Sequence, residues 1–432
     1  MTNDKHLDLS RSKLKRAYDR FVPQQFFKLL GIEDITKVKL GDQVERTMTI
    51  LFSDIRNFTS LSESMSPQQN FDFINSYLSQ MEPVISQNGG MIDKYVGDAI
   101  MVLFPNGADD ALNGSIAMLR MLESYNQERS KAGYSSIRIG IGLNTGLLML
   151  GTVGGKNRMQ GTVISDAVNL ASRIEGMTKY YGVDLLISEH TYHNLKNIKD
   201  YHIRFIDRVL VKGKSQPQSI YEVFSADEVS IREVKIKTIK IFEEALASYH
   251  LKQMENAQDL LHKCLAANPE DVPVRFYLDR CKRFLDNGVH EGTGEFDRNI
   301  VWDENMKVGV KEIDDQHKEL FEYTNALMNA IRERKDQNEV GKVISFLNDY
   351  VINHFREEEE IMREYNYPFL SFQKEQHEKF IKYFKEVKDE LKEIRKSRTY
   401  LRFRIQLLVV DWLVNHTYKE DRHFGRFLMH RG

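Results

Sequence analysis

The stretch GGMIDKYVGDAIMVLF (residues 89–104) places a tight turn, Val96-Gly97-Asp98, between two apolar runs, and it predicts a β-hairpin. The segment TMTILFSDI (47–55) predicts a further strand, which carries Asp54 near its end. Each segment therefore puts one aspartate at an exposed rim. Two such carboxylates can share divalent metal ions that bind a triphosphate, although two unrelated turn aspartates would look the same.

Helices and strands alternate around these two segments. Ser66 and Pro67 predict a helix start, because serine caps helix ends and proline is tolerated in the first turn. The predicted helices cover 66–87, 108–132 and 166–178, and the further strands cover 137–146, 183–188, 208–213 and 219–224. This order predicts an α/β or α+β domain over 41–226, preceded by a helical lead-in over 1–40 that closes on Gly31.

The remainder of the chain is helical in pattern. Residues 227–288 have the alanine, tyrosine and leucine spacing of a tetratricopeptide-like helix pair, and they are too short for a peptide-binding array. We interpret them as a coupling segment. The glycine-rich stretch DNGVHEGTGEF (286–296) marks a linker, which we place at 289–296. Four long helical patterns follow over 297–432, and they predict an all-α four-helix bundle.

The composition limits the classes of protein to which the chain can belong. Its 432 residues predict two or three domains, and a net charge of −2 with 41% apolar residues is typical of soluble globular proteins. The charge balance argues against nucleic acid binding, and no apolar run approaches the roughly 18 residues of a membrane span. The N-terminus lacks the apolar segment of a secretion signal. Two cysteines exclude a disulfide framework, so we expect a cytoplasmic protein.

Four motifs, in order, resemble the class III nucleotidyl cyclases over roughly residues 20–225: FSDIRNFT, DKYVGDAIM, DAVNLASR and VKGK. The resemblance implies a homodimeric enzyme that acts on ATP, with two Mg²⁺ or Mn²⁺ ions in each active site. It assigns Asp54 and Asp98 to the metals, and Asn169 and Arg173 to the ribose and the transition state. The other substrate contacts that we assign on this basis are Lys94 and Thr162 to adenine, Lys212 to the phosphates, and Phe58.

Lys94 favours adenine over guanine. The N1 atom of adenine accepts a hydrogen bond from an ammonium group, whereas N1 of guanine carries a hydrogen and would be repelled. The guanylyl members of the family carry glutamate at this position. Thr162 can both accept and donate a hydrogen bond, so it discriminates less sharply. Asn169 and Arg173 are four residues apart on a predicted helix, so they can reach one ligand.

Four further motifs resemble the bacterial hemerythrins over about 297–432: WDENMKVGVKEIDDQHKEL, HFREEEEIM, QKEQHEKF and DWLVNHTYKEDRHF. The resemblance implies a di-iron centre inside the bundle, with O₂ or another small molecule as ligand. Imidazole with carboxylate is a donor set that suits iron. By position in the motifs, one iron takes His317 and His354, the other takes His377 and His416, and Glu358 and Asp421 bridge the two.

The spacing of these residues raises two questions. His416 and Asp421 are five residues apart, about 140° on an ideal helix, so a π-like widening or side-chain reach must bring them together. The family pattern has a further histidine where this chain has Gln373. Its amide could ligate iron, hydrogen-bond a water or leave a vacancy, and we favour the last two. The open alternatives are histidines that only cap helices or face solvent, and a bundle that no longer holds two irons.

Together the motifs predict an adenylyl cyclase whose output is set by an oxygen- or redox-responsive di-iron bundle. Two alternatives remain at this point. One is a guanylyl cyclase, which Lys94 opposes. The other is an oxygen- or iron-binding protein with an inert cyclase domain, which the full set of cyclase residues opposes.

Overall fold

The computed structural model describes residues 24–32, 34–155, 158–210, 217–288, 290–291, 299–333, 335–392 and 398–429. The chain divides into two compact units. One consists of Met1–Ile206 with Ile220–Arg232, and the other of Asp207–Ser219 with Glu233–Gly432. The second unit therefore takes in a short part of the sheet that the first unit is built on.

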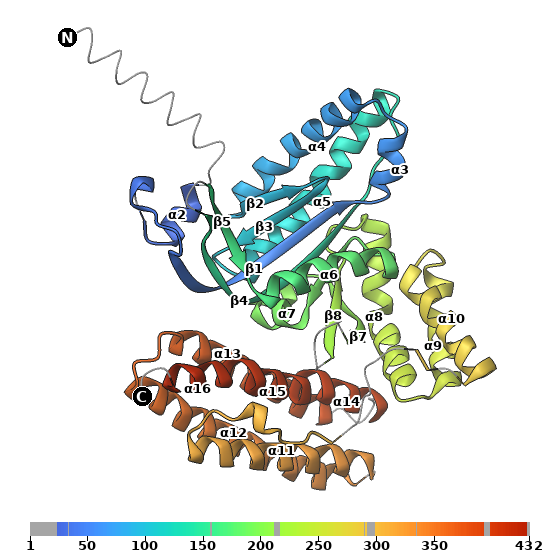
Figure 1. The fold of residues 1–432 in the computed structure, drawn as a ribbon. Coiled ribbons are helices and arrows are strands. Elements are labelled where there is room, and N and C mark those ends of the chain that lie inside the picture. Colours follow the sequence, from blue (N-terminus) through green and yellow to red (C-terminus); the bar gives the residue numbers. More distant parts are fainter. Residues whose placement is uncertain are drawn as a thin grey trace. The chain divides into compact units, whose positions relative to one another are not determined.

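The first unit is built on a mixed sheet with the strand order β2-β3-β1-β4-β6-β8-β7, and β5 pairs with β4 outside this path (Figure 1). The strands are β1 (Gln43–Ile55), β2 (Met91–Val96), β3 (Ala99–Phe104), β4 (Ile139–Gly155), β5 (Arg158–Ile164), β6 (Leu185–Ser188), β7 (Ile203–Val209) and β8 (Gln218–Val223). β4 and β6 are parallel, whereas β1 is antiparallel to both of its neighbours. Helices alternate with these strands, so the predicted α/β class is confirmed.

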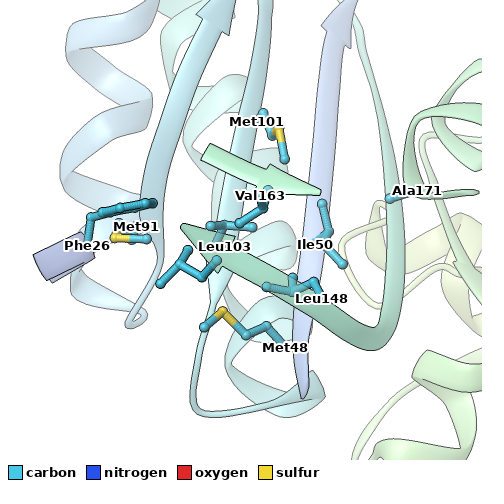
Figure 2. Packing of buried hydrophobic residues seen from close by; sticks show 10 residues of the cluster. Phe26, Met48, Ile50, Met91, Met101, Leu103, Leu148, Val163 and Ala171 are labelled. Atoms are coloured by element: carbon cyan, nitrogen blue, oxygen red, sulfur yellow. The ribbon is translucent and has the colours of Figure 1, made fainter. Parts of the chain in front are cut away.

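One face of the sheet carries a hydrophobic core. Met48 and Ile50 lie two residues apart on β1 and therefore point to the same face. Figure 2 shows them with Phe26 of α2 (Gln24–Leu29) and Ala171 of α6 (Asp166–Tyr181). Gly161 of β5 makes this packing possible, because a Cβ atom there would lie 2.7 Å from the Phe26 ring.

Two long helices, α4 (Pro67–Gln87) and α5 (Ala108–Lys131), pack side by side in the same unit (Figure 1). Ser66 caps α4 as predicted. Its hydroxyl accepts from the Gln69 backbone amide, and the Gln69 side chain accepts from the Ser66 amide. This reciprocal pair is a capping box, which satisfies two amide groups that a helix start leaves unpaired.

The predicted hairpin is confirmed. Val96 of β2 pairs with Ala99 of β3, and Gly97 in the turn has φ +66°, a conformation that favours glycine. The predicted helix over 108–132 and the strands over 47–55 and 137–146 are also present, each with shifted ends. Of the lead-in predicted over 1–40, residues 1–23 and 33 lie outside the described residues. α2 ends at Leu29, and Gly31 follows with φ +74°.

Two strands differ from the prediction. β5 was not predicted, because RMQGTVI is mostly polar and mostly exposed. The strand predicted over 208–213 is β7 in the structure and begins at Ile203; residues 211–213 lie outside the described residues. Its charged residues hide it from hydropathy patterning, yet five consecutive residues are buried. Arg204 is accommodated by an ion pair to Glu222 of β8 at 2.5 Å.

The second unit contains two groups of helices. The first group is α8 (Val229–His250, most of which lies in this unit), α9 (Met254–Ala267) and α10 (Val272–Asn287), which agrees with the helical pattern predicted over 227–288. α9 and α10 pack against each other. The boundaries that we assign to the coupling segment, the linker and the other domains stay predictions.

The second group of helices has the four long patterns predicted after 297. Three of them are α11 (Lys311–Arg332), α12 (Gln337–Glu364) and α13 (Leu370–Lys392). The fourth pattern is one continuous stretch of α14 (Arg398–Ile405), a π-helix (Gln406–Val410), α15 (Asp411–His416), a second π-helix (Thr417–Asp421) and α16 (Arg422–Met429). In the described part of the chain, no helix has the length and apolar character needed to cross a lipid bilayer.

The close packing of α6 on β4 makes the stability of the unit sensitive to substitution at Gly142. A Cβ atom at Gly142 would collide with the backbone nitrogen of Glu175, which cannot move without shifting the helix. We therefore expect Gly142→Ala to destabilise the unit by about 1–3 kcal/mol. Differential scanning calorimetry measures this as a lower Tm.

Gly176→Ala, on α6 itself, is the matched control. Nothing lies within 4 Å of a Cβ atom there, so this variant is expected to keep or raise the Tm. Equal Tm values for the two variants would contradict the packing described for Gly142.

Candidate nucleotide and metal sites

Asp54 and Asp98 lie together at the end of β1. The backbone amide of Ile55 donates to Asp54 Oδ1 at 3.1 Å and to Asp98 Oδ2 at 3.3 Å. Partial burial and the neighbouring Asp54 raise the pKa of Asp98 to about 7. Two close carboxylates that resist joint ionisation form a donor set suited to a hard divalent cation. The residues therefore fit the predicted Mg²⁺ or Mn²⁺ site.

Lys94 and Thr162 are also brought together. Lys94 lies on β2 and Thr162 on β5, and the Lys94 ammonium donates to Thr162 Oγ1 at 3.1 Å. Lys94 also pairs with the carboxylate of Asp93 at 3.1 Å. Two strands that are not neighbours in the sheet thus present both predicted adenine contacts at one place.

The other predicted cyclase residues are spread over the unit. Asn169 and Arg173 lie on α6, and both are exposed on that helix. Phe58 begins the short helix α3 (Phe58–Glu63) and stacks on Phe73 of α4, with ring centroids 6.4 Å apart. Lys212 lies outside the described residues. The structure of one chain therefore brings together two pairs, Asp54 with Asp98 and Lys94 with Thr162.

A third acidic residue near the metal aspartates was not predicted. Burial and the charge of Asp54 raise the pKa of Glu175 to about 7, while Arg56 acts in the opposite direction. Glu175 lies on α6, two residues after Arg173. Its place in the motif RIEG was visible in the sequence, but only the fold brings it close to β1.

Six predicted iron ligands converge in the interior of the bundle. All six are at least 95% buried. Their donor atoms form two groups, and Glu358 belongs to both of them. The first group is His317, His354 and Glu358, and the second is Glu358, His377, His416 and Asp421. The arrangement agrees with the two-iron assignment made from the motifs.

The distances inside these groups are short. His377 Nε2 lies 3.1 Å from His416 Nε2, and His416 Nε2 lies 3.1 Å from Asp421 Oδ1. Asp421 Oδ2 lies 3.4 Å from His317 Nε2, so this carboxylate faces both histidine groups. Asp421, which the motifs assign as a bridge, thus lies between the two histidine groups.

The π-helix Thr417–Asp421 explains how His416 and Asp421 meet. An α-helix would turn them about 140° apart, whereas the i to i+5 geometry of a π-helix returns residue 421 to the face of residue 416. The expected widening is therefore present, and it lies at the residues that need it.

Two residues that sequence reasoning missed orient the histidines. The Nδ1 atom of His354 is 2.7 Å from Gln316 Oε1, and the Gln316 amide donates to Glu357 at 2.6 Å. The Nδ1 atom of His377 is 2.9 Å from Glu359 Oε1. A carbonyl or carboxylate acceptor at Nδ1 fixes the tautomer and leaves Nε2 for a metal. The only signal in the sequence was that each residue is next to a predicted ligand: Gln316 precedes His317, and Glu359 follows Glu358.

Several buried polar atoms of the predicted iron ligands show whether these residues fit a metal. Among the described residues, both ring nitrogens of His317, both carboxylate oxygens of Glu358 and Oδ2 of Asp421 are buried without a hydrogen-bond partner. Buried polar atoms need partners, and a bound cation supplies them. Burial also lowers the pKa of His377 to about 4, and it lowers the pKa of His317 and of His354. Neutral imidazole is the form that binds metals, so the residues fit a di-iron centre.

Gln373 occupies the position of the missing histidine and is 1% exposed. Its amide nitrogen lies 3.4 Å from Asp421 Oδ1, while its Oε1 atom is buried without a hydrogen-bond partner in the described structure. The side chain therefore faces the same interior as the ligands.

Two family models match the chain. The adenylate and guanylate cyclase catalytic domain matches residues 41–224, and the hemerythrin HHE cation-binding domain matches residues 308–428. The chain therefore contains both domains, in the order expected from the motifs.

Curated relatives match part of the chain. An adenylate cyclase of Anabaena cylindrica is 46% identical over 226 residues, which cover 50% of this chain and 45% of that protein. The terminal-differentiation specific adenylate cyclase of Dictyostelium discoideum is 38% identical over 282 residues, 63% of this chain and 13% of that protein. The chain thus spans less than half the length of either relative. Among solved structures, the adenylyl cyclase CyaB from P. aeruginosa is 34% identical, with 42% of this chain and 95% of that chain covered and a TM-score of 0.36.

Gln373 generates a prediction about iron retention. An imidazole at this buried position adds a donor beside Asp421, so Gln373→His is expected to raise the iron retained against a chelator by roughly 10-fold or more. Gln373→Leu removes the amide and is expected to leave iron content unchanged, because we do not expect the amide to be a ligand. Metal analysis after dialysis measures both.

Loss of iron from Gln373→Leu would contradict this expectation and make the amide oxygen a ligand. Unchanged retention in Gln373→His would contradict the assignment of position 373 to the metal site.

Proposed function

We propose that this chain, which contains a class III cyclase domain and a hemerythrin domain, is an adenylyl cyclase regulated by its di-iron bundle. The observation that carries the proposed substrate is the contact of Lys94 with Thr162 at 3.1 Å. In the same domain the two aspartates suited to divalent metals share one backbone amide. The relatives named above as adenylate cyclases support the same substrate.

The proposed reaction forms cyclic AMP and pyrophosphate from ATP. The ribose 3′-oxygen attacks the α-phosphorus, the bond from that phosphorus to the pyrophosphate oxygen breaks, and the 3′-hydroxyl proton is released to water. The divalent ions, when bound, supply charge neutralisation at the phosphates and at the attacking oxygen. The Arg173 guanidinium stabilises the charge that develops on the transferred phosphoryl group, and Asn169 orients the ribose.

Base selection follows from the hydrogen-bonding capacity of the two adenine contacts. The Lys94 ammonium has only donors and therefore matches the acceptor at adenine N1. Thr162 Oγ1 can accept from the exocyclic amine of adenine. Because Lys94 also donates to Thr162, the two side chains are held in one place before the base arrives.

We further propose that the active site forms between two copies of the chain. Asn169 and Arg173 lie on an exposed part of α6, where a second chain can reach them. In the proposed homodimer, one copy supplies Asp54 and Asp98 and the other supplies the adenine contacts, Asn169 and Arg173. A symmetric dimer then has two equivalent sites.

Regulation by the bundle is the remaining part of the proposal. A di-iron centre, when loaded, supplies a site at which O₂ or an oxidant changes the charge and ligands of the metal. The buried ligands Glu358 and Asp421 connect such a change to α12 and to the π-helix of the last stretch. A cytoplasmic location completes the proposal.

Mixing two inactive variants tests the shared site. Asp54→Ala and Arg173→Ala each disable both sites of a homodimer, but a mixed dimer retains one intact site. With equal amounts of the two variants, random exchange makes half of the dimers mixed, and each mixed dimer has one intact site of two. Cyclic AMP formation from ATP is therefore expected to return to about a quarter of the wild-type rate. The assay measures cyclic AMP and cyclic GMP side by side.

A mixture of Asp54→Ala with Asp98→Ala is the matched control, because both residues come from the same copy and no intact site can form. Recovery in this control, or none in the first mixture, would refute the shared site. A higher rate with GTP than with ATP would overturn the assignment of the substrate.

A further inference from the structure

Charged side chains are buried together at the end of β7. Asp207, Arg208, His250, Arg280 and Asp411 are each at least 92% buried, and all five belong to the second compact unit. They come from four different places in the chain: the strand, α8, α10 and the fourth helical stretch of the bundle. None of them has a role in the cyclase or iron sites described above.

Asp207 connects the strand to the coupling helices. Its Oδ2 atom accepts from Arg280 of α10 at 2.7 Å, and its Oδ1 atom lies 3.5 Å from His250 Nε2 of α8. Arg280 also approaches the carboxylate of Glu291 at 3.7 Å. The planar guanidinium gives this charge-assisted hydrogen bond a fixed direction, and loss of either partner would leave the other charge buried without compensation.

Arg208, the next residue, connects the same strand to the bundle. Its Nη2 atom donates to Asp411 Oδ1 at 2.6 Å, and the Gln406 amide donates to the same oxygen at 2.8 Å. Nearby, the Gln218 amide at the start of β8 lies 3.4 Å from Asn415 Oδ1. Both strand ends therefore contact α15, through residues at the two ends of that short helix.

α15 also carries an iron ligand. Asp411 begins this helix and His416 ends it, and a π-helix lies on each side, at Gln406–Val410 and at Thr417–Asp421. π-Helical turns are rare and occur frequently at functional sites. A displacement of His416 or Asp421 at the metal thus acts on a segment of only six residues that is attached at its other end to Arg208.

Lys212, the proposed phosphate contact, follows Arg208 by four residues in the sequence, although it lies outside the described residues. Arg208 is therefore close along the chain to a residue that we assign to the phosphates.

We propose that Arg208 is a positioning residue, and that its ion pair with Asp411 carries changes at the iron site to β7 of the cyclase sheet. This inference rests on the proposed function, because it names the path by which the bundle regulates the cyclase. A purely structural brace would hold the same elements together but would not depend on the state of the iron.

The test compares variants in the air-oxidised and the chemically reduced holoenzyme. Asp411→Asn keeps the size of the side chain and removes its charge. We expect it to retain iron and turnover of ATP, while the ratio of cyclic AMP rates in the two iron states falls to within about twofold of one. Hydrogen exchange of the peptide 203–210 is expected to differ between the two states in the wild type and to become equal in the variant.

Tyr400→Phe is the matched control. It removes the hydrogen bond of 2.9 Å from Tyr400 to Glu243, which also joins the last stretch of the bundle to α8 but does not involve β7. We expect the wild-type ratio and the wild-type exchange pattern. If Asp411→Asn does not fold, Arg208→Lys, which keeps the charge but loses the fork geometry, takes its place with the same expected outcome.

The outcomes separate the two proposals. A wild-type ratio that persists in Asp411→Asn, with unchanged exchange, overturns the coupling path and leaves the enzyme assignment intact. Equal wild-type rates in the two iron states overturn regulation and the path together. A wild type that forms no cyclic AMP from ATP overturns the proposed function itself.

Discussion

The position of Asp421 between two groups of buried histidines is the constraint on which the bundle depends. Its carboxylate faces His416 at 3.1 Å and His317 at 3.4 Å, and these histidines belong to different helices. Burial and the nearby charge of Asp421 raise the pKa of Glu358 well above its usual range, because the two carboxylates lie close together in a buried site. A cation relieves this repulsion. The same logic holds on a smaller scale for Asp54 and Asp98, whose carboxylates share the amide of Ile55.

The two sites differ in how much of their chemistry one chain contains. The bundle collects all six predicted ligands in its interior, together with the groups that orient His354 and His377. The cyclase domain collects its residues as pairs, and it leaves Asn169 and Arg173 exposed on α6. A buried metal site suits a sensor that must exclude most solutes. The site divided between two copies that we propose for the cyclase suits an output that responds to small changes in how the copies meet.

Local patterns allowed much of this to be predicted. The glycine turn at Gly97, the Ser66 cap and the spacing from His416 to Asp421 each depend on neighbours in the sequence, and each has the expected structure. Contacts between residues far apart in the sequence could not be predicted in this way. β7 was misplaced because Arg204 and Asp207 make a buried strand read as polar, and their partners are known only from the fold. Arg208 and Asp411 are 203 residues apart, so no periodicity could have joined them.

In the proposed function, the state of the iron sets the rate of cyclic AMP formation. The most direct measurement follows one anaerobic, reduced sample of the wild-type protein as oxygen is admitted in steps, recording the visible spectrum of the iron and the rate of cyclic AMP formation together. We predict that the rate changes in proportion to the fraction of iron that is oxidised and returns on reduction. A spectrum that cycles between the two states while the rate stays constant would contradict control of the cyclase by the iron.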